Sequence, residues 1–437
     1  MLALAPDAGS TAAGRKLAAP GPWSATGSSP GTAGQPGDDA QPAVWGLCSG
    51  SGKNPYQTVV DLGGPAFRCS CPSRKFPCKH ALGLLLLWSA GGVAPGGPPD
   101  WAASWLADRA GRAAARPAAD AGPAGAPDPA AAARRVEQRA ARVAGGVEEL
   151  ATWLADQVRG GLAGLERSGH RPFDAVAARM VDAQAPGLAA RLRDLPGVVA
   201  GGAGWPGRLL EELAQLHLTV AASRRLDRLP PGLAACVSRE LGVPVAREDV
   251  LATAPVRDEW SVVGLRDSSA DRLTTRRVWL HGARTGRTAL VLSFAPPGQA
   301  PDATLVPGTA LDADLHFHPG SAPLRAVVGT RHGEPRPLPR WAGGSLDDAA
   351  RAFAAAVAAD PWTTSWPVLL AAVTPLPAEP RWVGVDATGG RVPLLGEEAR
   401  WRLLAVSGGR PVPLAAECTA TGIRPVSVLD GDRLVLL

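Results

Sequence analysis

The chain has 437 residues, of which 46% are hydrophobic, enough apolar material for about two to four packed domains. A formal net charge of +5 is small for this length and does not by itself indicate nucleic-acid binding, which usually shows as a concentrated basic patch. Six cysteines are present, and three of them fall inside residues 69–80. This clustering argues against a disulfide framework and favours a reducing compartment.

The N-terminus lacks the sustained apolar stretch of a cleaved signal peptide. The longest apolar run, residues 81–88, is far shorter than the roughly 20 residues that a membrane-spanning helix requires. We therefore expect a soluble, cytoplasmic protein that makes no membrane contact.

Residues 1–44 are rich in Gly, Pro, Ser and Ala and lack periodicity, so a mostly disordered lead-in is predicted there. After it, "YQTVVDLG" predicts a strand that closes on a turn, and "AFRCSC" predicts a second extended segment. "PCKHALGLLLLWSAGG" predicts a helix that ends at Gly91 and Gly92. Residues 45–110 are thus predicted to form a ββα module, closed by a short helix at "PDWAASWLADR".

Residues 111–130 carry Pro and Ala without an apolar stripe and are predicted to be a linker. Beyond them, apolar side chains recur every three or four positions from Val143 to Leu165, which is the pattern of an amphipathic helix. Similar segments continue the pattern, so residues 131–242 are predicted to be an all-helical domain.

Past residue 243 the sequence contains runs of strand-forming residues separated by turn residues, and residues 243–340 are predicted to be a β-domain. Residues 341–376 are predicted to be a helical connection around "SLDDAARAFAAAVAADPW", with Ser345 as its N-cap. Short strands and tight Gly turns in residues 377–437 favour a small barrel-like β-module. The expected fold class is therefore α+β and multidomain.

The most specific motif in the chain is the spacing C-x-C-x6-C-x-H, formed by Cys69, Cys71, Cys78 and His80. Side chains two apart in an extended segment point the same way, so the first two cysteines can face one metal. Three thiolates and one imidazole complete the tetrahedral shell of a structural zinc site, whereas a catalytic zinc usually keeps one position for water. We predict one structural Zn²⁺, whose binding contributes folding free energy on the order of 10 kcal/mol.

Basic residues surround this motif: residues 45–90 contain five bases and a single acid, Asp61. The bases are Lys53, Arg68, Arg74, Lys75 and Lys79. They can balance the negative charge of a zinc–thiolate centre, or they can contact phosphates or a partner protein. Both interpretations remain open at this point.

The segment "CSCPSRKFPCKHALGLLL" resembles a SWIM-type zinc finger at every ligand position, which implies that Cys69, Cys71, Cys78 and His80 bind the zinc. Together with "AARMVDAQAPGLAARLR", it is similar to a subfamily of bacterial SWIM-finger proteins that is common in actinobacteria. Such proteins are often encoded beside a MoxR-type AAA ATPase and a von Willebrand A-domain protein. The resemblance implies DNA or protein partners and no single established activity.

Three other signals are weaker. "GSGKN" at residues 50–54 fails the P-loop pattern, because Leu47 and Asn54 stand where glycine and a hydroxyl residue are needed, so a turn between strands is predicted. Cys48 is interpreted as a small, half-buried residue rather than a further ligand or a reactive thiol. The alternating row in "DADLHFHPG" is interpreted as a solvated strand face rather than a second metal site. That row consists of Asp312, Asp314, His316 and His318.

None of the hydrolase, metalloprotease, kinase or dinucleotide motifs is present, and no catalytic residue is predicted. The first hypothesis is a non-enzymatic adaptor that docks a protein partner, with the MoxR-type system as the partner implied by the resemblance. Arg179, Asp182 and Gln184, within residues 172–193, are its candidate surface. The alternative is a DNA-binding regulator that uses the basic finger. An enzyme in the β-region would need a pocket with converging polar groups.

Overall fold

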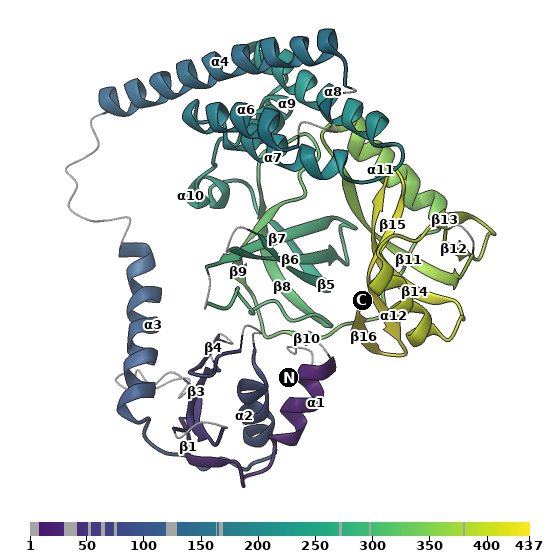
Figure 1. Cartoon of the computed structure of the whole chain (residues 1–437). Coiled ribbons are helices and arrows are strands. Elements are labelled where there is room, and N and C mark those ends of the chain that lie inside the picture. Colours follow the sequence, from purple (N-terminus) through teal and green to yellow (C-terminus); the bar gives the residue numbers. More distant parts are fainter. Residues whose placement is uncertain are drawn as a thin grey trace.

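The computed structural model describes residues 8–29, 42–50, 54–62, 66–73, 77–118, 129–162, 164–165, 169–270, 273–296, 299–378 and 381–437. These residues form an N-terminal module, a helical bundle and two β-sheets with their covering helices (Figure 1). The mixed α and β content predicted for the chain is confirmed.

The N-terminal module is a four-stranded antiparallel sheet in the order β1–β2–β3–β4. Its strands are β1 (Trp23–Ser29), β2 (Ala43–Cys48), β3 (Tyr56–Asp61) and β4 (Ala66–Cys69), and its helices are α1 (Ala8–Lys16), α2 (Lys79–Ser89) and α3 (Asp100–Ala118). Alternate strand residues face opposite sides. Val44 and Val60 pack with α2, whereas Trp45 and Val59 pack with α3. Helices therefore cover both faces of the sheet (Figure 1).

Residues 8–29 correct the predicted lead-in, because they form α1 and the edge strand β1. Trp23 lies in the core of the module, and its indole N–H donates a 2.8 Å hydrogen bond to the carbonyl of Leu17. A Cβ atom at Gly83 of α2 would lie 2.6 Å from the Cβ of Leu17, so only glycine allows this close approach. The module thus has four strands, whereas the predicted ββα arrangement has two. The strands β2 and β3 flank the turn predicted at residues 50–54, of which residues 51–53 lie outside the described part. Residues 1–7 and 30–41 lie outside the described residues.

Two helices overlap the predicted linker of residues 111–130. Helix α3 continues to Ala118, and the next helix begins at Pro129. Residues 119–128 lie outside the described part of the chain. Alanine is the strongest helix former, which lets a segment without an apolar stripe continue a helix that packing has already started.

The middle of the chain is a helical bundle, as predicted. Its helices are α4 (Pro129–Gly160), α6 (Arg171–Asp182), α7 (Pro186–Val199), α8 (Trp205–Ser223) and α9 (Pro231–Leu241), followed by the short α10 (Arg247–Leu251). Leu150, Phe173, Met180, Leu192 and Leu216 are fully buried in its core.

The second sheet has the order β10–β8–β5–β6–β7, with β9 paired to β8. Its antiparallel strands are β5 (Val256–Ala270), β6 (Leu273–Gly282), β7 (Thr288–Ala295), β8 (Thr309–Phe317), β9 (Ala326–Arg331) and β10 (Arg336–Pro337). The predicted β-rich character of the C-terminal region is confirmed.

The third sheet has the order β13–β12–β11–β14–β15–β16. Its strands are β11 (Ser365–Leu376), β12 (Val383–Asp386), β13 (Arg391–Pro393), β14 (Val412–Thr419), β15 (Gly422–Asp430) and β16 (Arg433–Leu436). Two helices pack against it, α11 (Leu346–Ala359) and α12 (Glu397–Ser407). The hydroxyl of Ser345 accepts a hydrogen bond from the N–H of Asp348, which confirms the predicted N-cap of α11.

The predicted small barrel-like module of residues 377–437 is wrong. Among the described residues the third sheet is open, with β13 and β16 at its two edges. Its central strand β11 comes from residues 341–376, which were predicted to be a helical connection. Helices α11 and α12 cover one face and the second sheet covers the other, so the sheet buries its apolar residues without closing on itself.

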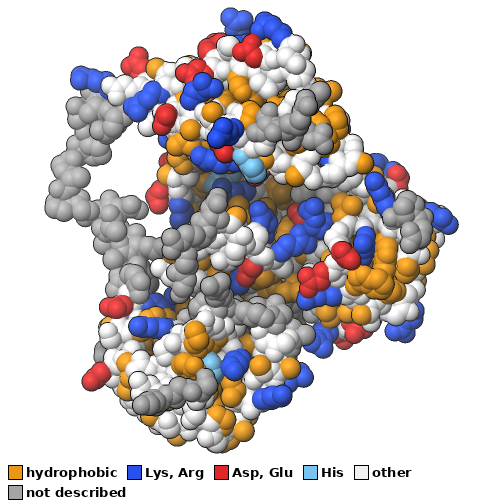
Figure 2. All heavy atoms as spheres, in the orientation of Figure 1, with side chains coloured by type: hydrophobic (Ala, Val, Ile, Leu, Met, Phe, Trp, Pro, Cys, Tyr) orange, Lys and Arg blue, Asp and Glu red, His pale blue; other side chains and the backbone are white. Residues whose placement is uncertain are grey.

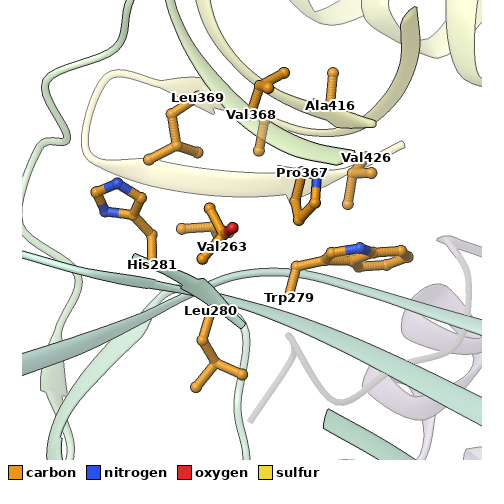
Figure 3. A pocket seen from close by; sticks show the side chains of 11 residues that line it. Val263, Trp279, Leu280, His281, Pro367, Val368, Leu369, Ala416 and Val426 are labelled. Carbon is orange, nitrogen blue, oxygen red and sulfur yellow. The ribbon is translucent and has the colours of Figure 1, made fainter. Parts of the chain in front are cut away.

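The second and third sheets pack face to face (Figure 3). Trp279 and His281 of β6 point towards Pro367 and Leu369 of β11, whereas Leu280 points to the opposite side (Figure 3). The space left between them is about 10 Å³, at most the room for one water molecule. No described helix is both long enough and apolar enough to cross a membrane.

Candidate metal centre

The four predicted zinc ligands converge at the N-terminus of α2. Cys69 is the last residue of β4, and Cys71 lies in the bend that follows it. Cys78 is the N-cap residue of α2 with an extended backbone, and His80 lies in the first turn of that helix. Of the four ligands, only Cys69 lies on a strand. Cys71 comes two residues later, beyond the end of β4, so the prediction that both cysteines lie on one extended strand is correct only for Cys69.

The ligand atoms of these four residues all lie within 4.8 Å of one another. The Nδ1 atom of His80 is 3.7 Å from the Sγ atom of Cys69 and 4.0 Å from the Sγ atom of Cys78. A tetrahedral zinc with ordinary Zn–S and Zn–N bonds keeps its ligand atoms roughly 3.5–3.8 Å apart. The donor set and its spacing therefore fit one Zn²⁺, with His80 binding through Nδ1.

Burial and charge also fit a metal. Cys78 and His80 are buried, and Cys69 and Cys71 are half-buried. The pKa of Cys69 is lowered to about 4, chiefly by its hydrogen bond with the Cys78 thiol, and the same bond raises the pKa of Cys78. Burial raises the pKa of Cys71. The protein alone thus favours one thiolate, and a divalent cation would stabilise all three. The positive end of α2 adds to this effect.

Two residues outside the motif support the ligands. Thr58 of β3 is fully buried, and its hydroxyl oxygen lies 3.3 Å from the Sγ atom of Cys69. The ring of Tyr56 lies 5.0 Å from the ring of His80. The spacing of the motif could not reveal either residue, because both come from the neighbouring strand, which reaches the site through pairing of β3 with β4. Such outer contacts orient metal ligands and tune their basicity.

Cys48 lies in the same core as the ligands but outside the four-ligand cluster. It is fully buried rather than half-buried, and burial raises the pKa of its thiol. Packing in the core therefore accounts for Cys48, in agreement with its interpretation as a small packing residue rather than a metal ligand or a reactive thiol.

The basic residues are only partly described. Arg68 and Lys79 are exposed, and Lys53, Arg74 and Lys75 lie outside the described residues. In Figure 2 the blue side chains of the N-terminal module, at the bottom of the view, are separated by white and orange surface. Asp61, the single acid counted in this region, is buried and forms a 2.6 Å ion pair with Arg109 of α3. Nothing in the described surface singles out a nucleic-acid site.

The second row of metal-type residues has other partners. Asp312 pairs with Arg257 at 2.8 Å, Asp314 with His332 at 2.9 Å, and the Nδ1 atom of His316 lies 2.8 Å from the carbonyl of Thr253. The part of the chain that the structure describes contains no second cluster of metal-binding side chains. Asp312, Asp314 and His316 thus belong to the hydrogen-bonding network around β8. All four residues of the row, His318 included, are half-buried, so the predicted solvated strand face is only partly exposed.

The geometry defines a zinc-binding protein with a closed Cys₃His site that serves as a structural centre. Comparison with protein families gives two matches: residues 59–88 match the SWIM zinc finger, and residues 138–241 match the SWIM-associated four-helix bundle domain. The chain therefore contains a SWIM zinc finger holding one structural zinc ion, together with the helical domain associated with such fingers. No curated protein and no solved structure matches the chain.

Proposed function

We propose that the protein is a cytoplasmic, non-enzymatic interaction adaptor, in which the zinc-stabilised module and the helical bundle dock a protein partner. The observation that supports this proposal most directly is that protein side chains occupy every coordination position of the zinc site. Cys69, Cys71, Cys78 and His80 supply all four positions of a tetrahedral shell, so the zinc contributes stability rather than a coordination site for a substrate. SWIM domains are interaction modules for proteins or nucleic acids, which is consistent with this role.

The partner that the family resemblance suggests is a MoxR-type ATPase acting with a von Willebrand A-domain protein. The bundle offers exposed polar residues for such a contact: Arg179 and Asp182 of α6 are exposed, and Gln184 is half-buried just after that helix. Arg179 lies 3.6 Å from Glu149, and both side chains are more than half exposed. An ion pair of this kind adds little to folding stability, so Arg179 can be changed without unfolding the bundle.

The test uses the zinc-loaded full chain and a purified MoxR-type ATPase, the partner that the family resemblance suggests, with affinity measured by isothermal titration calorimetry. We expect a complex that Arg179→Glu and Asp182→Lys weaken by about tenfold or more, which is the effect of truncating an interface residue worth over 1 kcal/mol. Arg433→Glu, an exposed substitution on β16, is the matched control and should leave the affinity unchanged.

Absence of a complex, or equal affinity in all three variants, would contradict the adaptor role of this surface. A parallel titration with duplex DNA tests the other type of partner. Binding that falls steeply with salt and is lost in Arg68→Gln together with Lys79→Gln would support nucleic-acid recognition in place of the adaptor.

A further inference from the structure

The turn that joins α6 to α7 contains a strained residue. Gln184 has a φ of 60°, in the left-handed region that residues other than glycine rarely adopt. Apart from Ala25, in the irregular part of β1, every other positive φ among the described residues falls on glycine. Gln184 stands just after the end of α6, where helices usually place glycine and sometimes asparagine. Glutamine costs stability at such a position, so the turn itself does not explain its presence.

Backbone hydrogen bonds define the conformation of this turn. The N–H of Ala185 donates a 2.9 Å hydrogen bond to the carbonyl of Met180, which closes the left-handed turn at the end of α6. Ala185 is also fully buried in the core of the bundle. These contacts fix the backbone of Gln184 and do not involve its side chain.

Close packing at both ends keeps the turn rigid. A Cβ atom at Gly146 of α4 would lie 2.4 Å from the Cβ atom of Ala183, and one at Gly187 would lie 2.2 Å from the carbonyl oxygen of Glu240 in α9. Neither glycine has room for a side chain, because the neighbouring helices approach the turn too closely. The turn therefore cannot relax, and Gln184 keeps its strained conformation.

The side-chain amide of Gln184 is free to bind a group outside the chain. Within the described residues it has no hydrogen-bond partner, and neither its oxygen nor its nitrogen is among the fully buried polar atoms. The amide offers an acceptor and a donor side by side in one plane. A strained residue that is held in place by its surroundings and carries a free polar group indicates a functional position.

The surface around this turn suits a protein better than a nucleic acid. Val181 is 45% exposed and Pro186 is exposed, so apolar groups flank the amide. Asp182 is exposed, and its negative charge disfavours a phosphate backbone. Arg179, the base nearest to the turn along the chain, already lies 3.6 Å from Glu149.

We propose that Gln184 recognises the main chain of an extended segment in the protein partner. The amide oxygen accepts a backbone N–H of that segment, and the amide nitrogen donates to a backbone carbonyl beside it. In a helix both backbone groups are already paired within the helix, so an extended segment is the form that offers them. This inference rests on the adaptor role proposed above and specifies what the surface around α6 contacts.

Three substitutions at Gln184 separate the backbone strain from the amide. Gln184→Gly relieves the strain and removes the amide, whereas Gln184→Glu keeps the size and the strain but replaces the donor by a carboxylate oxygen. Gln184→Asn relieves part of the strain and keeps a shorter amide. Each zinc-loaded full chain is titrated with the purified MoxR-type ATPase by calorimetry, and its melting temperature is measured without the ATPase.

Affinity and stability should change in opposite directions. We expect the affinity to fall about tenfold or more in Gln184→Gly and Gln184→Glu, which lose one or both hydrogen bonds, and to fall less in Gln184→Asn. The melting temperature should rise by about 1–4 °C in Gln184→Gly, rise less in Gln184→Asn and change little in Gln184→Glu. A residue that only packs would lower the melting temperature when it is truncated. Arg433→Glu is again the control and should keep the affinity of the wild type.

Hydrogen exchange tests the main-chain contact directly. A segment of the ATPase outside its helices should exchange its amide protons more slowly in complex with the wild type than in complex with Gln184→Glu. Equal exchange in the two complexes would overturn the assignment of the amide to the partner's main chain.

The remaining outcomes distinguish this inference from the adaptor role. If Arg179→Glu weakens the complex while Gln184→Gly and Gln184→Glu bind as tightly as the wild type, the inference is overturned and the adaptor role stands. A lower melting temperature in Gln184→Gly also overturns it, because the side chain would then be structural. If the wild type binds no ATPase, the adaptor role and this inference fail together. Binding of duplex DNA that Gln184→Glu abolishes would assign the amide to a base edge and overturn the protein contact.

Discussion

The indole N–H of Trp362 donates a 2.9 Å hydrogen bond to the hydroxyl of Thr219, which lies in α8 of the helical bundle. Trp362 follows α11 in the C-terminal region, yet it is only 8% exposed and packs into the core of the bundle. Beside it, Arg239 of α9 forms a 2.9 Å ion pair with the buried carboxylate of Asp360. Buried contacts therefore join the bundle to the C-terminal sheets, although the sequence places them in separate domains.

Replacing Trp362 should destabilise both regions together. We expect Trp362→Ala to lower the free energy of unfolding by about 3–5 kcal/mol, the usual cost of deleting a buried aromatic ring. Trp362→Phe keeps much of the buried area and loses the hydrogen bond, which costs about 1 kcal/mol, so its effect should be smaller. Urea denaturation followed by circular dichroism measures both. A change within about 0.5 kcal/mol for Trp362→Ala, typical of surface sites, would contradict the anchoring role.

The buried imidazole of His318 makes the free energy of unfolding depend on pH. Burial lowers the pKa of its imidazole to about 4, with the charge of Arg325 adding to the effect, from an ordinary value of 6.5. Between these two pH values the folded state binds fewer protons than the unfolded state. His318 therefore reduces stability progressively as the pH falls from 6.5 towards 4 and has no such effect at higher pH.

The variant His318→Gln should flatten this dependence. We expect the difference in unfolding free energy between wild type and variant to shift in favour of the variant as the pH falls from about 7.5 to about 5. The zinc ligands are the same in both proteins, so their protonation cancels in the difference. Parallel stability curves over this range would show that His318 titrates in the folded state as freely as in the unfolded chain.

The metal centre could be predicted from the sequence because it is local. All four ligands lie within residues 69–80, and the turn of chain between β4 and α2 is enough to bring them together. Thr58 and Tyr56 could not be predicted in the same way, because they reach the site through the pairing of β3 with β4. Spacing rules describe one segment, whereas outer contacts depend on which segments become neighbours.

The parts of the fold that were predicted wrongly have the same cause, because they also depend on pairing between segments that are distant in the sequence. The strand β1 has weak local signals and is ordered by pairing with β2 and by burial of Trp23. The strand β11 follows a helix directly, so residues 341–376 were predicted to be a helical connection, and its place in the sheet comes from pairing with the distant β14. Composition in a short window cannot report such pairings.

Loss of one zinc ligand should unfold the N-terminal module and spare the rest of the chain. Cys78→Ser removes a buried ligand, and structural zinc contributes folding free energy on the order of 10 kcal/mol. We expect this variant to lose its zinc, by elemental analysis, and to become protease-sensitive within residues 8–118, while residues 131–437 remain resistant. Ala303, from the segment between β7 and β8, packs against the core of the module and should become more exposed.

Cys48→Ser is the matched control for Cys78→Ser. Both residues are buried in the same core, but Cys48 lies outside the ligand cluster, so its variant should keep one zinc per chain. Degradation of the whole chain in Cys78→Ser would show that the module and the remainder fold as one unit. Zinc loss in Cys48→Ser would make Cys48 part of the metal site.

Thr58 should strengthen zinc binding without touching the metal. Its hydroxyl lies 3.3 Å from the Sγ atom of Cys69 and can donate a hydrogen bond to the thiolate, which disperses the negative charge and holds the ligand in place. Thr58→Val has nearly the same shape and lacks the donor, so we expect zinc affinity to fall by about 10–100-fold, the usual effect of removing an outer-shell partner. Competition with a chromophoric chelator measures this change.

Thr58→Ser keeps the hydroxyl and separates hydrogen bonding from packing. If the hydrogen bond supports the ligand, the serine variant should bind zinc nearly as tightly as the wild type, although it leaves a small cavity in the core. If Thr58 serves only to fill space, the order reverses: the valine variant keeps its zinc affinity and the serine variant loses stability. The two substitutions therefore distinguish a residue that tunes the metal centre from one that only packs beside it.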